Sequence, residues 1–217
     1  MSADHRYIYV NGDSFCEGNY LDTPNDCWPT SLIEAGIHVI NDSFGMGSNY
    51  RIVRTTFETF SNTPHIFNTA IFGWSSIYRY EVPGQPDSKK PQMFSLDETM
   101  KEWNYTPKQH CDAQEHILQE NFLTQFVTIE NICRTLGITP WHFYAFSQPN
   151  PAHILDDINR DRILKKYKRL ESANWILPPE TTLIDWAKTK NLSFLDDGHL
   201  TAESYSVFGN YVKGILA

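Results

Sequence analysis

Short apolar runs alternate with amphipathic segments along the first third of the chain. The runs at residues 7–10, 38–40 and 65–72 are rich in aromatic and β-branched residues, and each gives way to polar or glycine-containing residues, which is typical of strands. Residues 28–35 and 50–60 carry helix signals, namely Pro29 in a first turn, Gly36 after a last turn, and apolar residues at helical spacing. This alternation predicts βαβ units and a parallel sheet.

The alternation is interrupted at about residues 78–113, which contain four prolines and keep neither a helical nor a strand period. We interpret this segment as an insertion packed over the sheet edge. The later pattern predicts helices at 114–136, 156–170 and 202–216 and strands at 141–146 and 192–195. Residues 1–217 are therefore expected to form a single α/β domain, a three-layer α/β/α sandwich around a five-stranded parallel sheet.

Charge and composition narrow the kinds of partner. The formal net charge is −8, from 18 basic and 26 acidic residues, and no basic block occurs, so nucleic acid is disfavoured as a partner. No apolar stretch approaches the roughly 18 residues of a membrane span. The first residues lack the pattern of a signal peptide, so a cytoplasmic protein that does not enter membranes is expected. The four widely spaced cysteines form no CxxC pair and are expected to be free thiols.

A candidate nucleophile follows the first predicted strand, in the sequence Gly12-Asp13-Ser14. Ligands of parallel sheets bind beyond the carboxyl ends of the strands, so the Ser14 hydroxyl is expected at that edge. Nearby backbone N–H groups are then placed to stabilise an oxyanion. The alternative is that Asp13 or Ser14 merely caps a turn or helix.

A candidate base stands near the other end of the chain, where Asp196 precedes His199 by three residues after the last predicted strand. A serine hydroxyl is a weak nucleophile until an imidazole takes its proton, and a carboxylate is needed to fix the imidazole tautomer. The alternative is a surface histidine, with Asp197 or Thr201 capping the next helix.

Together these residues resemble the sequence blocks of the SGNH (GDSL) hydrolase superfamily. The resemblance implies a flavodoxin-like fold and ester hydrolysis without a metal or other cofactor. It assigns Ser14 as nucleophile, His199 as base and Asp196 as the residue that orients the base. The loop at 41–49 resembles the second block, whose backbone N–H joins that of Ser14 in the oxyanion hole. The serine, aspartate, histidine order of the chain also agrees.

Two blocks depart from the family pattern. In the second block Gly45, Met46 or Gly47 can each occupy the position of the usual glycine, so all three are candidate oxyanion donors. In the third block Gly-Trp-Ser-Ser, with Ser75 at its third position, stands where the family has Gly-x-Asn-Asp. The Ser75 hydroxyl is a candidate donor, shorter than the amide it replaces. Gly-Trp-Ser with Ser-Asn-x-x-Ile in the second block resembles a branch found in phages and bacteria.

Further residues are candidates for binding the substrate. Asp13, Asn49, Trp74 and Arg79 all lie in or beside these blocks. Core packing is the alternative for Trp74, and an ion pair with Glu81 is the alternative for Arg79. Metal-binding residue types also gather between His110 and His116, but a spacing of six puts the two histidines on different helical faces. Neither phosphate-loop nor dinucleotide-binding glycine motifs occur, so no cofactor is expected.

The sequence thus predicts a serine esterase acting on short acyl esters, most simply O-acetyl groups on a carbohydrate, with a small-molecule or glycan ester as its partner. Three alternatives remain. One is an acyltransferase or amidase using the same triad. Another is a catalytically weak module for glycan binding or assembly. The third is a metal hydrolase centred on His110 and His116. The oligomeric state is not indicated by the sequence.

Overall fold

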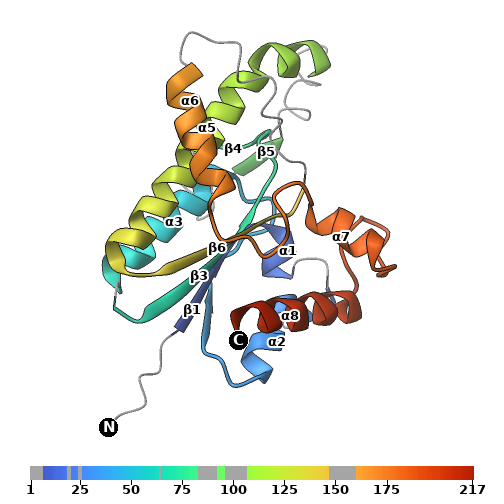
Figure 1. Cartoon of the computed structure of the whole chain (residues 1–217). Helices are drawn as coiled ribbons and strands as arrows, with labels where there is room; N and C mark the ends of the chain where they lie inside the picture. The colour runs from blue at the N-terminus through green and yellow to red at the C-terminus, as the bar shows by residue number, and fades with distance from the viewer. Residues whose placement is uncertain are drawn as a thin grey trace.

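The structure is a computed structural model that describes residues 7–18, 21–23, 26–63, 65–82, 92–95, 107–146 and 160–217 (Figure 1). Its centre is a parallel sheet with the strand order β2-β1-β3-β6. The strands are β1 (Tyr7–Asn11), β2 (Val39–Asn41), β3 (Phe67–Trp74) and β6 (Thr139–Tyr144). Tyr9 pairs with Ile40 on one side and with Ala70 on the other, and Ile71 pairs with Trp141. The predicted parallel α/β fold is confirmed.

The edge of the sheet beyond β6 differs from the prediction. Residues 192–195 form no strand, and Phe194 makes only an isolated antiparallel bridge with Leu200. The segment beside β6 comes instead from residues 174–182, where Trp175 and Thr182 make isolated parallel bridges with β6. Two prolines at 178 and 179 lie between these bridges, and a proline has no N–H to donate to a ladder. In the described part of the chain the parallel sheet therefore has four strands and one broken edge, where five strands were expected.

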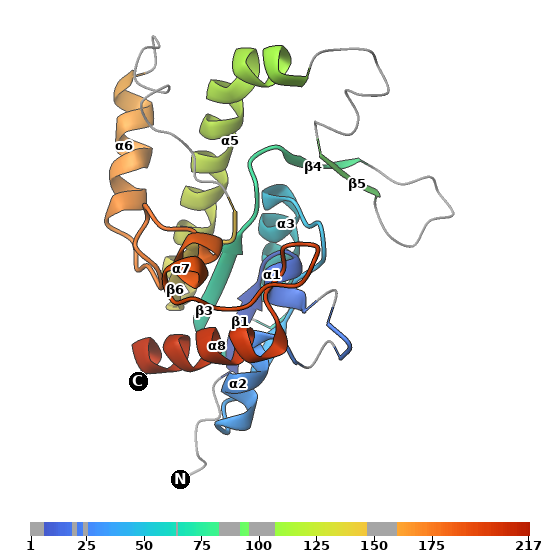
Figure 2. The same ribbon diagram turned by 90° about the vertical axis from the view of Figure 1, so that its right-hand side faces the viewer.

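Helices cover both faces of the sheet (Figures 1 and 2). One layer contains α1 (Ser14–Glu17), α2 (Trp28–Glu34), α7 (Leu183–Thr189) and α8 (Ala202–Leu216). The other contains α3 (Asn49–Asn62), α5 (Pro107–Leu136) and α6 (Arg160–Glu171). Because successive strand residues point to opposite faces, Val10 packs among the first set of helices and Tyr9 among the second. Both faces are buried, as expected for a parallel sheet.

Part of the predicted insertion is described by the structure. Within it, β4 (Arg79–Val82) and β5 (Gln92–Ser95) pair as an antiparallel two-stranded sheet, and α5 begins at Pro107, seven residues before the predicted helix start. The remaining residues of 78–113 lie outside the described part of the chain. Among the helices of the described residues, none is long and apolar enough to cross a membrane.

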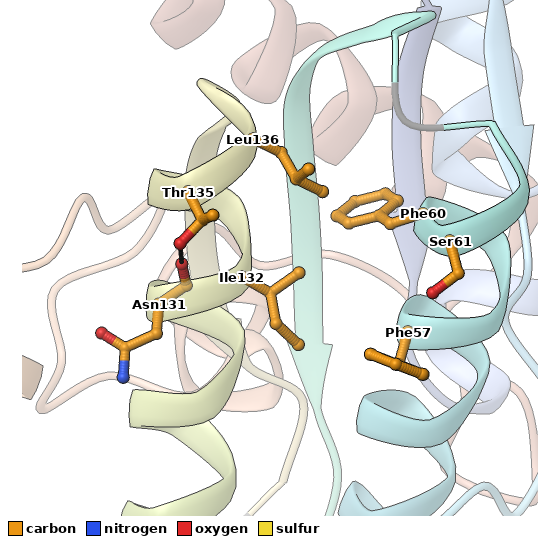
Figure 3. Close-up of a pocket in the computed structure, with 7 residues that line it drawn as sticks. All are labelled: Phe57, Phe60, Ser61, Asn131, Ile132, Thr135 and Leu136. Atoms are coloured by element: carbon orange, nitrogen blue, oxygen red, sulfur yellow. Dashed lines mark hydrogen bonds between the residues drawn. The ribbon is translucent and has the colours of Figure 1, made fainter.

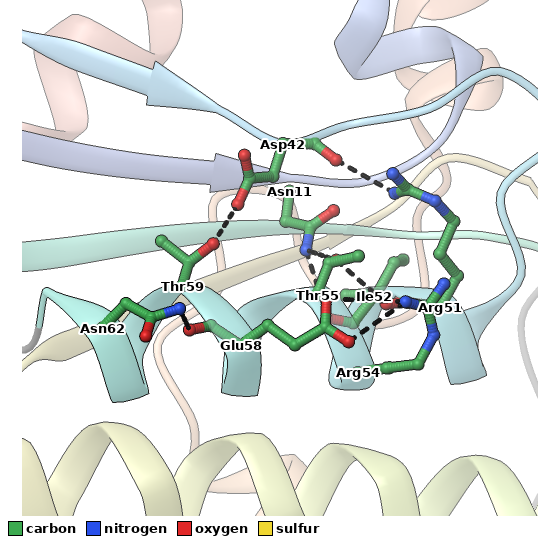
Figure 4. A network of polar contacts seen from close by, with 9 residues as sticks. All are labelled: Asn11, Asp42, Arg51, Ile52, Arg54, Thr55, Glu58, Thr59 and Asn62. Carbon is green, nitrogen blue, oxygen red and sulfur yellow. Dashed lines mark hydrogen bonds and ion pairs between the residues drawn. The ribbon is translucent and has the colours of Figure 1, made fainter. Parts of the chain in front are cut away.

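A polar network ties α3 to the carboxyl ends of β1 and β2 (Figure 4). The buried Asn11 side chain donates from Nδ2 to the Ile52 carbonyl at 3.1 Å and to Thr55 Oγ1 at 2.8 Å. Thr59 Oγ1 donates to the Asp42 carboxylate at 2.5 Å. The start of the loop at 41–49 is therefore tied to α3 by side chains, while the Asp42 N–H still donates to the Val10 carbonyl of β1 at 2.9 Å.

Candidate active site

The first and last sequence blocks meet at the carboxyl edge of the sheet. Ser14 is the first residue of α1, directly after β1, and its side chain is only 2% exposed. Its Oγ lies 2.8 Å from His199 Nε2, although the two residues are 185 positions apart in the chain. A hydroxyl and an imidazole at this distance form the contact needed for proton transfer between them.

The carboxylate at the far side of the imidazole belongs to Asp197. Asp197 Oδ1 lies 3.2 Å from His199 Nδ1 and accepts the His199 backbone N–H at 3.0 Å. Gly198 supplies the turn between them, with φ at +88°, a conformation that costs glycine little. Asp196, the predicted orienting residue, is exposed to solvent. The structure therefore brings to His199 Nδ1 the carboxylate of Asp197, which entered the sequence analysis only as a possible helix cap in the alternative interpretation.

The environment of His199 lowers its pKa. Burial is the main cause, the Asp197 carboxylate opposes it, and the positive charge of Arg79 adds to it. Phe15 covers one face of the imidazole in a stacked arrangement, with ring centroids 4.7 Å apart. A lowered pKa keeps the imidazole neutral at pH 7, as a proton acceptor must be.

The loop at 41–49 is fastened to the turn that carries Ser14. Its Phe44 N–H donates to the Gly12 carbonyl at 3.1 Å. Of the three predicted oxyanion donors, Gly45 N–H donates to the Glu17 carboxylate, and Gly47 N–H donates to the Phe44 carbonyl at 2.8 Å. Met46 lies between them with φ at +60°, and its N–H donates to no other described residue. Among these three, Met46 is the one whose backbone donor is available.

The two glycines that flank the site are required by close packing. A Cβ on Gly12 would lie 2.5 Å from Cys16 Sγ and 2.9 Å from the Gly73 carbonyl oxygen. A Cβ on Gly73 would meet the same sulfur and lie 2.8 Å from Phe143 Cζ. The buried Cys16 side chain thus occupies the space between the ends of β1 and β3 as a packing residue. Cys16, Cys27 and Cys133 are free thiols, as predicted.

Asn49 holds the backbone after β3. Its Oδ1 accepts the Ser75 N–H at 2.8 Å, and its Nδ2 donates to the Ser75 carbonyl at 2.9 Å. Both residues are buried. Since this pairing uses both ends of the amide, Asn49 positions Ser75 in this structure rather than presenting its side chain to a substrate.

Asp13 and Arg79 form a buried ion pair beside Ser14. Asp13 is 0% exposed, and burial raises its pKa to about 6 even though Arg79 opposes the shift. Its Oδ2 lies 3.2 Å from Arg79 Nη1, and its Oδ1 accepts the Phe15 N–H at 3.0 Å. The same Nη1 donates to Ser75 Oγ at 3.1 Å. Asp13 is therefore both the helix cap of the alternative interpretation and the partner of Arg79.

Trp74 is a core residue and not a substrate contact in this structure. It is 0% exposed, and its indole Nε1 donates to His142 Nδ1 at 3.1 Å. His142 Nε2 in turn lies 2.8 Å from Glu130 Oε1. Burial lowers the His142 pKa, which suits a neutral ring accepting on one nitrogen and donating from the other. The local sequence around Trp74 does not reveal its place in the core, because its hydrogen-bond partner His142 is 68 positions away.

Two hollows flank α3. A cavity of about 130 Å³ borders the site, lined by Asn49, Tyr50, Ile77, Arg79, Leu118, Asn121, Phe122 and Gln125. A larger apolar groove of about 430 Å³ lies between α3 and α5, where Phe57 and Ile132 face each other (Figure 3). Its other lining residues include Phe60 and Leu136, near the carboxyl ends of the two helices. Those helix ends lead back to the amino ends of β3 and β6, so the groove lies at the opposite edge from Ser14.

The described residues contain no group of three or more histidine, cysteine or acidic side chains arranged to hold a metal ion. The side chains of the predicted cluster between His110 and His116 lie outside the described part of the chain. The same is true of Glu81, the alternative partner predicted for Arg79.

The parallel α/β/α sandwich is a fold that solved structures of lipolytic G-D-S-L family proteins share. No family model matches the sequence, and no curated protein does. TesA has a TM-score of 0.55 and 14% identity, covering 97% of this chain and 98% of its own. A lipolytic G-D-S-L family member from Veillonella parvula has a TM-score of 0.52 and 11% identity, covering 97% of both chains.

Two named esterases share the fold. The psychrotrophic esterase EstA from Pseudoalteromonas has a TM-score of 0.55 and 8% identity, covering 97% of this chain and 96% of its own. A two-domain esterase active on acetylated mannans has a TM-score of 0.53 and 9% identity, covering 97% of this chain but 48% of its own. At these identities the likeness establishes the fold of the protein, and its chemistry has to be argued from the site.

Proposed function

We propose that the protein is a serine esterase that hydrolyses short acyl esters through an acyl-enzyme. The observation that carries the proposal is the 2.8 Å contact between Ser14 Oγ and His199 Nε2, with the Asp197 carboxylate at Nδ1. This arrangement lets the imidazole accept a proton at one nitrogen while the carboxylate stabilises the imidazolium at the other. We assign the orienting role to Asp197, in place of the predicted Asp196.

The reaction proceeds in two balanced halves. Ser14 Oγ forms a bond to the acyl carbon, its proton passes to His199 Nε2, and the carbonyl electron pair moves onto the oxygen. The tetrahedral intermediate collapses, and the proton moves from His199 to the leaving alcohol as the ester C–O bond breaks. Water then attacks the acyl-enzyme, His199 takes its proton, and the same collapse releases the acid and returns the proton to Ser14.

The oxyanion of each intermediate needs donors on one side of the carbonyl. The backbone N–H of Ser14 at the start of α1 is one. The N–H of Met46, in a loop hydrogen-bonded to the Ser14 turn, is the second. Such preorganised N–H groups are worth about a hundredfold or more in rate.

For the substrate, we propose an O-acetyl or other short acyl ester on a carbohydrate. The cavity beside Arg79 is small, at about 130 Å³, and has the side-chain amides of Asn121 and Gln125 in its wall. Polar groups over an apolar floor suit a hydroxyl-rich ligand more than a long acyl chain. That an esterase acting on acetylated mannans has this fold is consistent with the proposal.

The test is hydrolysis of p-nitrophenyl acetate and butyrate, with fluorophosphonate labelling, by the wild type, Ser14→Ala and His199→Ala. We expect acetate to be preferred and both turnover and labelling to disappear in Ser14→Ala. Ser172→Ala, which changes an exposed serine at the end of α6, is the matched control and should behave as wild type. Wild-type protein that neither turns over nor labels would refute the esterase and favour the alternative of a glycan-binding module. Transfer of the acyl group to an alcohol in preference to water would instead favour the acyltransferase.

A further inference from the structure

Ser75 stands at the third-block position, but its backbone N–H is already used, because it donates to Asn49 Oδ1 at 2.8 Å. The Ser75 hydroxyl oxygen accepts a hydrogen bond from Arg79 Nη1 at 3.1 Å. The Arg79 guanidinium therefore lies against the one remaining donor of Ser75, and its charged N–H groups are stronger donors than that hydroxyl.

Arg79 is the cation at this position, and two contacts position its guanidinium. Asp13 Oδ2 lies 3.2 Å from Nη1, and the guanidinium carbon lies 4.4 Å from the centroid of the Phe146 ring. The guanidinium has five N–H donors in a fixed plane, and its described hydrogen bonds all use Nη1. Donors on its other two nitrogens remain for a ligand, and the side chain is 17% exposed.

The position of Arg79 joins the catalytic pair to the neighbouring cavity. On one side, Phe146 meets Phe15 edge-on with ring centroids 5.0 Å apart, and Phe15 stacks on His199. On the other side, Arg79 lines the cavity of about 130 Å³. The ends of β1 and β3 are adjacent, since Asn11 pairs with Phe72, so the residues that follow the two strands lie at the same edge of the sheet.

We propose that Arg79 is a catalytic residue whose guanidinium donates to the oxyanion formed from the substrate carbonyl, in place of Ser75. Asp13 is then a positioning residue, because it fixes the guanidinium plane and acts on the substrate only through Arg79. The inference rests on the proposed esterase function and extends it. A charged donor at this place stabilises the developing negative charge more than a hydroxyl does.

The experiment separates catalysis by Arg79 from neutralisation of a buried carboxylate. It compares kcat and KM for p-nitrophenyl acetate in the wild type, Arg79→Gln, Arg79→Lys, Asp13→Asn and the double variant Asp13→Asn/Arg79→Gln. The double variant removes both charges, so a purely structural need for the cation disappears with its partner. Arg54→Gln, which alters an arginine paired with Glu58 on α3, is the matched control and should keep the wild-type kcat.

We expect Arg79→Gln to lower kcat about a hundredfold or more with KM changed by about threefold or less. Arg79→Lys should retain part of kcat, because lysine keeps the positive charge but lacks the planar, multiple-donor guanidinium. The double variant should be as slow as Arg79→Gln. Recovery of the double variant to within about threefold of the wild type would overturn the inference and leave Arg79 as a structural counter-ion. If the wild type turns over and loses activity in Ser14→Ala while Arg79→Gln keeps its kcat, only this inference fails. A wild type without turnover removes the esterase proposal and this inference together.

Discussion

The buried Asp13 carboxylate gives the native state a pH dependence that can be isolated by the substitution Asp13→Asn. Burial raises its pKa from the ordinary value of 3.8 to about 6, with Arg79 opposing the shift. The folded state therefore holds this proton over a range of pH in which the unfolded chain has already released it. By linkage, the contribution of Asp13 to stability falls as pH rises through the window from about 4 to 6.

The size of this effect follows from the pKa change. At about 1.36 kcal/mol per pKa unit, a rise from 3.8 to about 6 corresponds to about 3 kcal/mol between the two ends of the window. Asp13 is fully buried, so solvent screening does not reduce the figure. Asparagine has the same shape, can still accept the Phe15 N–H, and does not ionise.

The assay is urea unfolding of the wild type and Asp13→Asn at several pH values between 4 and 7, followed by tryptophan fluorescence. We expect the free energy of unfolding of the variant, minus that of the wild type, to increase by about 3 kcal/mol from the acid to the neutral end. Asp196→Asn is the control for loss of a negative charge near the site. A difference that stays constant with pH, or that changes equally in Asp196→Asn, would refute the reasoning.

Three further predictions concern the site and its support. The acid limb of kcat/KM should have its midpoint below pH 6.5, because burial lowers the His199 pKa, and Asp197→Asn should move it lower still and reduce kcat at least about tenfold. If Asp196→Asn had the larger effect in the same pH profile, the orienting role would return to Asp196. Gly73→Ala should lower the free energy of unfolding by about 1–3 kcal/mol in urea titrations, since its Cβ would lie 2.8 Å from Phe143 Cζ. An unchanged urea midpoint would mean that Phe143 moves aside for the new Cβ at little energetic cost. Asn49→Ala should destabilise by about 1–3 kcal/mol and slow turnover, because both backbone groups of Ser75 lose their partner. Normal turnover in a folded Asn49→Ala protein would show that turnover does not depend on the two hydrogen bonds between Asn49 and the Ser75 backbone.

Local signals in the sequence were sufficient for most of the fold. The strands near residues 7–10 and 65–72 combine apolar runs with a glycine turn, and both form as predicted. The short run at 192–195 was indistinguishable by pattern from a strand, but Phe194 reaches only Leu200. The run that lies beside β6, around Trp175, is interrupted by prolines and could be placed only by its pairing with His142.

The site was predictable where chemistry depends on residue type, and less so where it depends on geometry. The contact between Ser14 and His199 could be predicted, because a serine hydroxyl needs an imidazole nearby to act as a nucleophile. Which of two adjacent aspartates reaches the imidazole depends on the turn at Gly198, with φ at +88°, and spacing alone does not determine it. Likewise, the Ser75 N–H is used by Asn49, 26 positions away, which local sequence cannot reveal.

Cys16 and Cys133 give the molecule two internal reporters of local opening. Cys16, close to Ser14 in α1, is buried on the face of the sheet covered by α2, α7 and α8, and Cys133, in α5, is buried on the opposite face. Burial raises the pKa of both thiols, so a thiol reagent reacts with either one only when its surroundings come apart. The rate of Cys16 modification, measured by peptide mass mapping, therefore reports how often the turn around Ser14 leaves its native packing. If Cys16 reacts faster than Cys133, this turn opens on its own while the other face of the sheet stays closed.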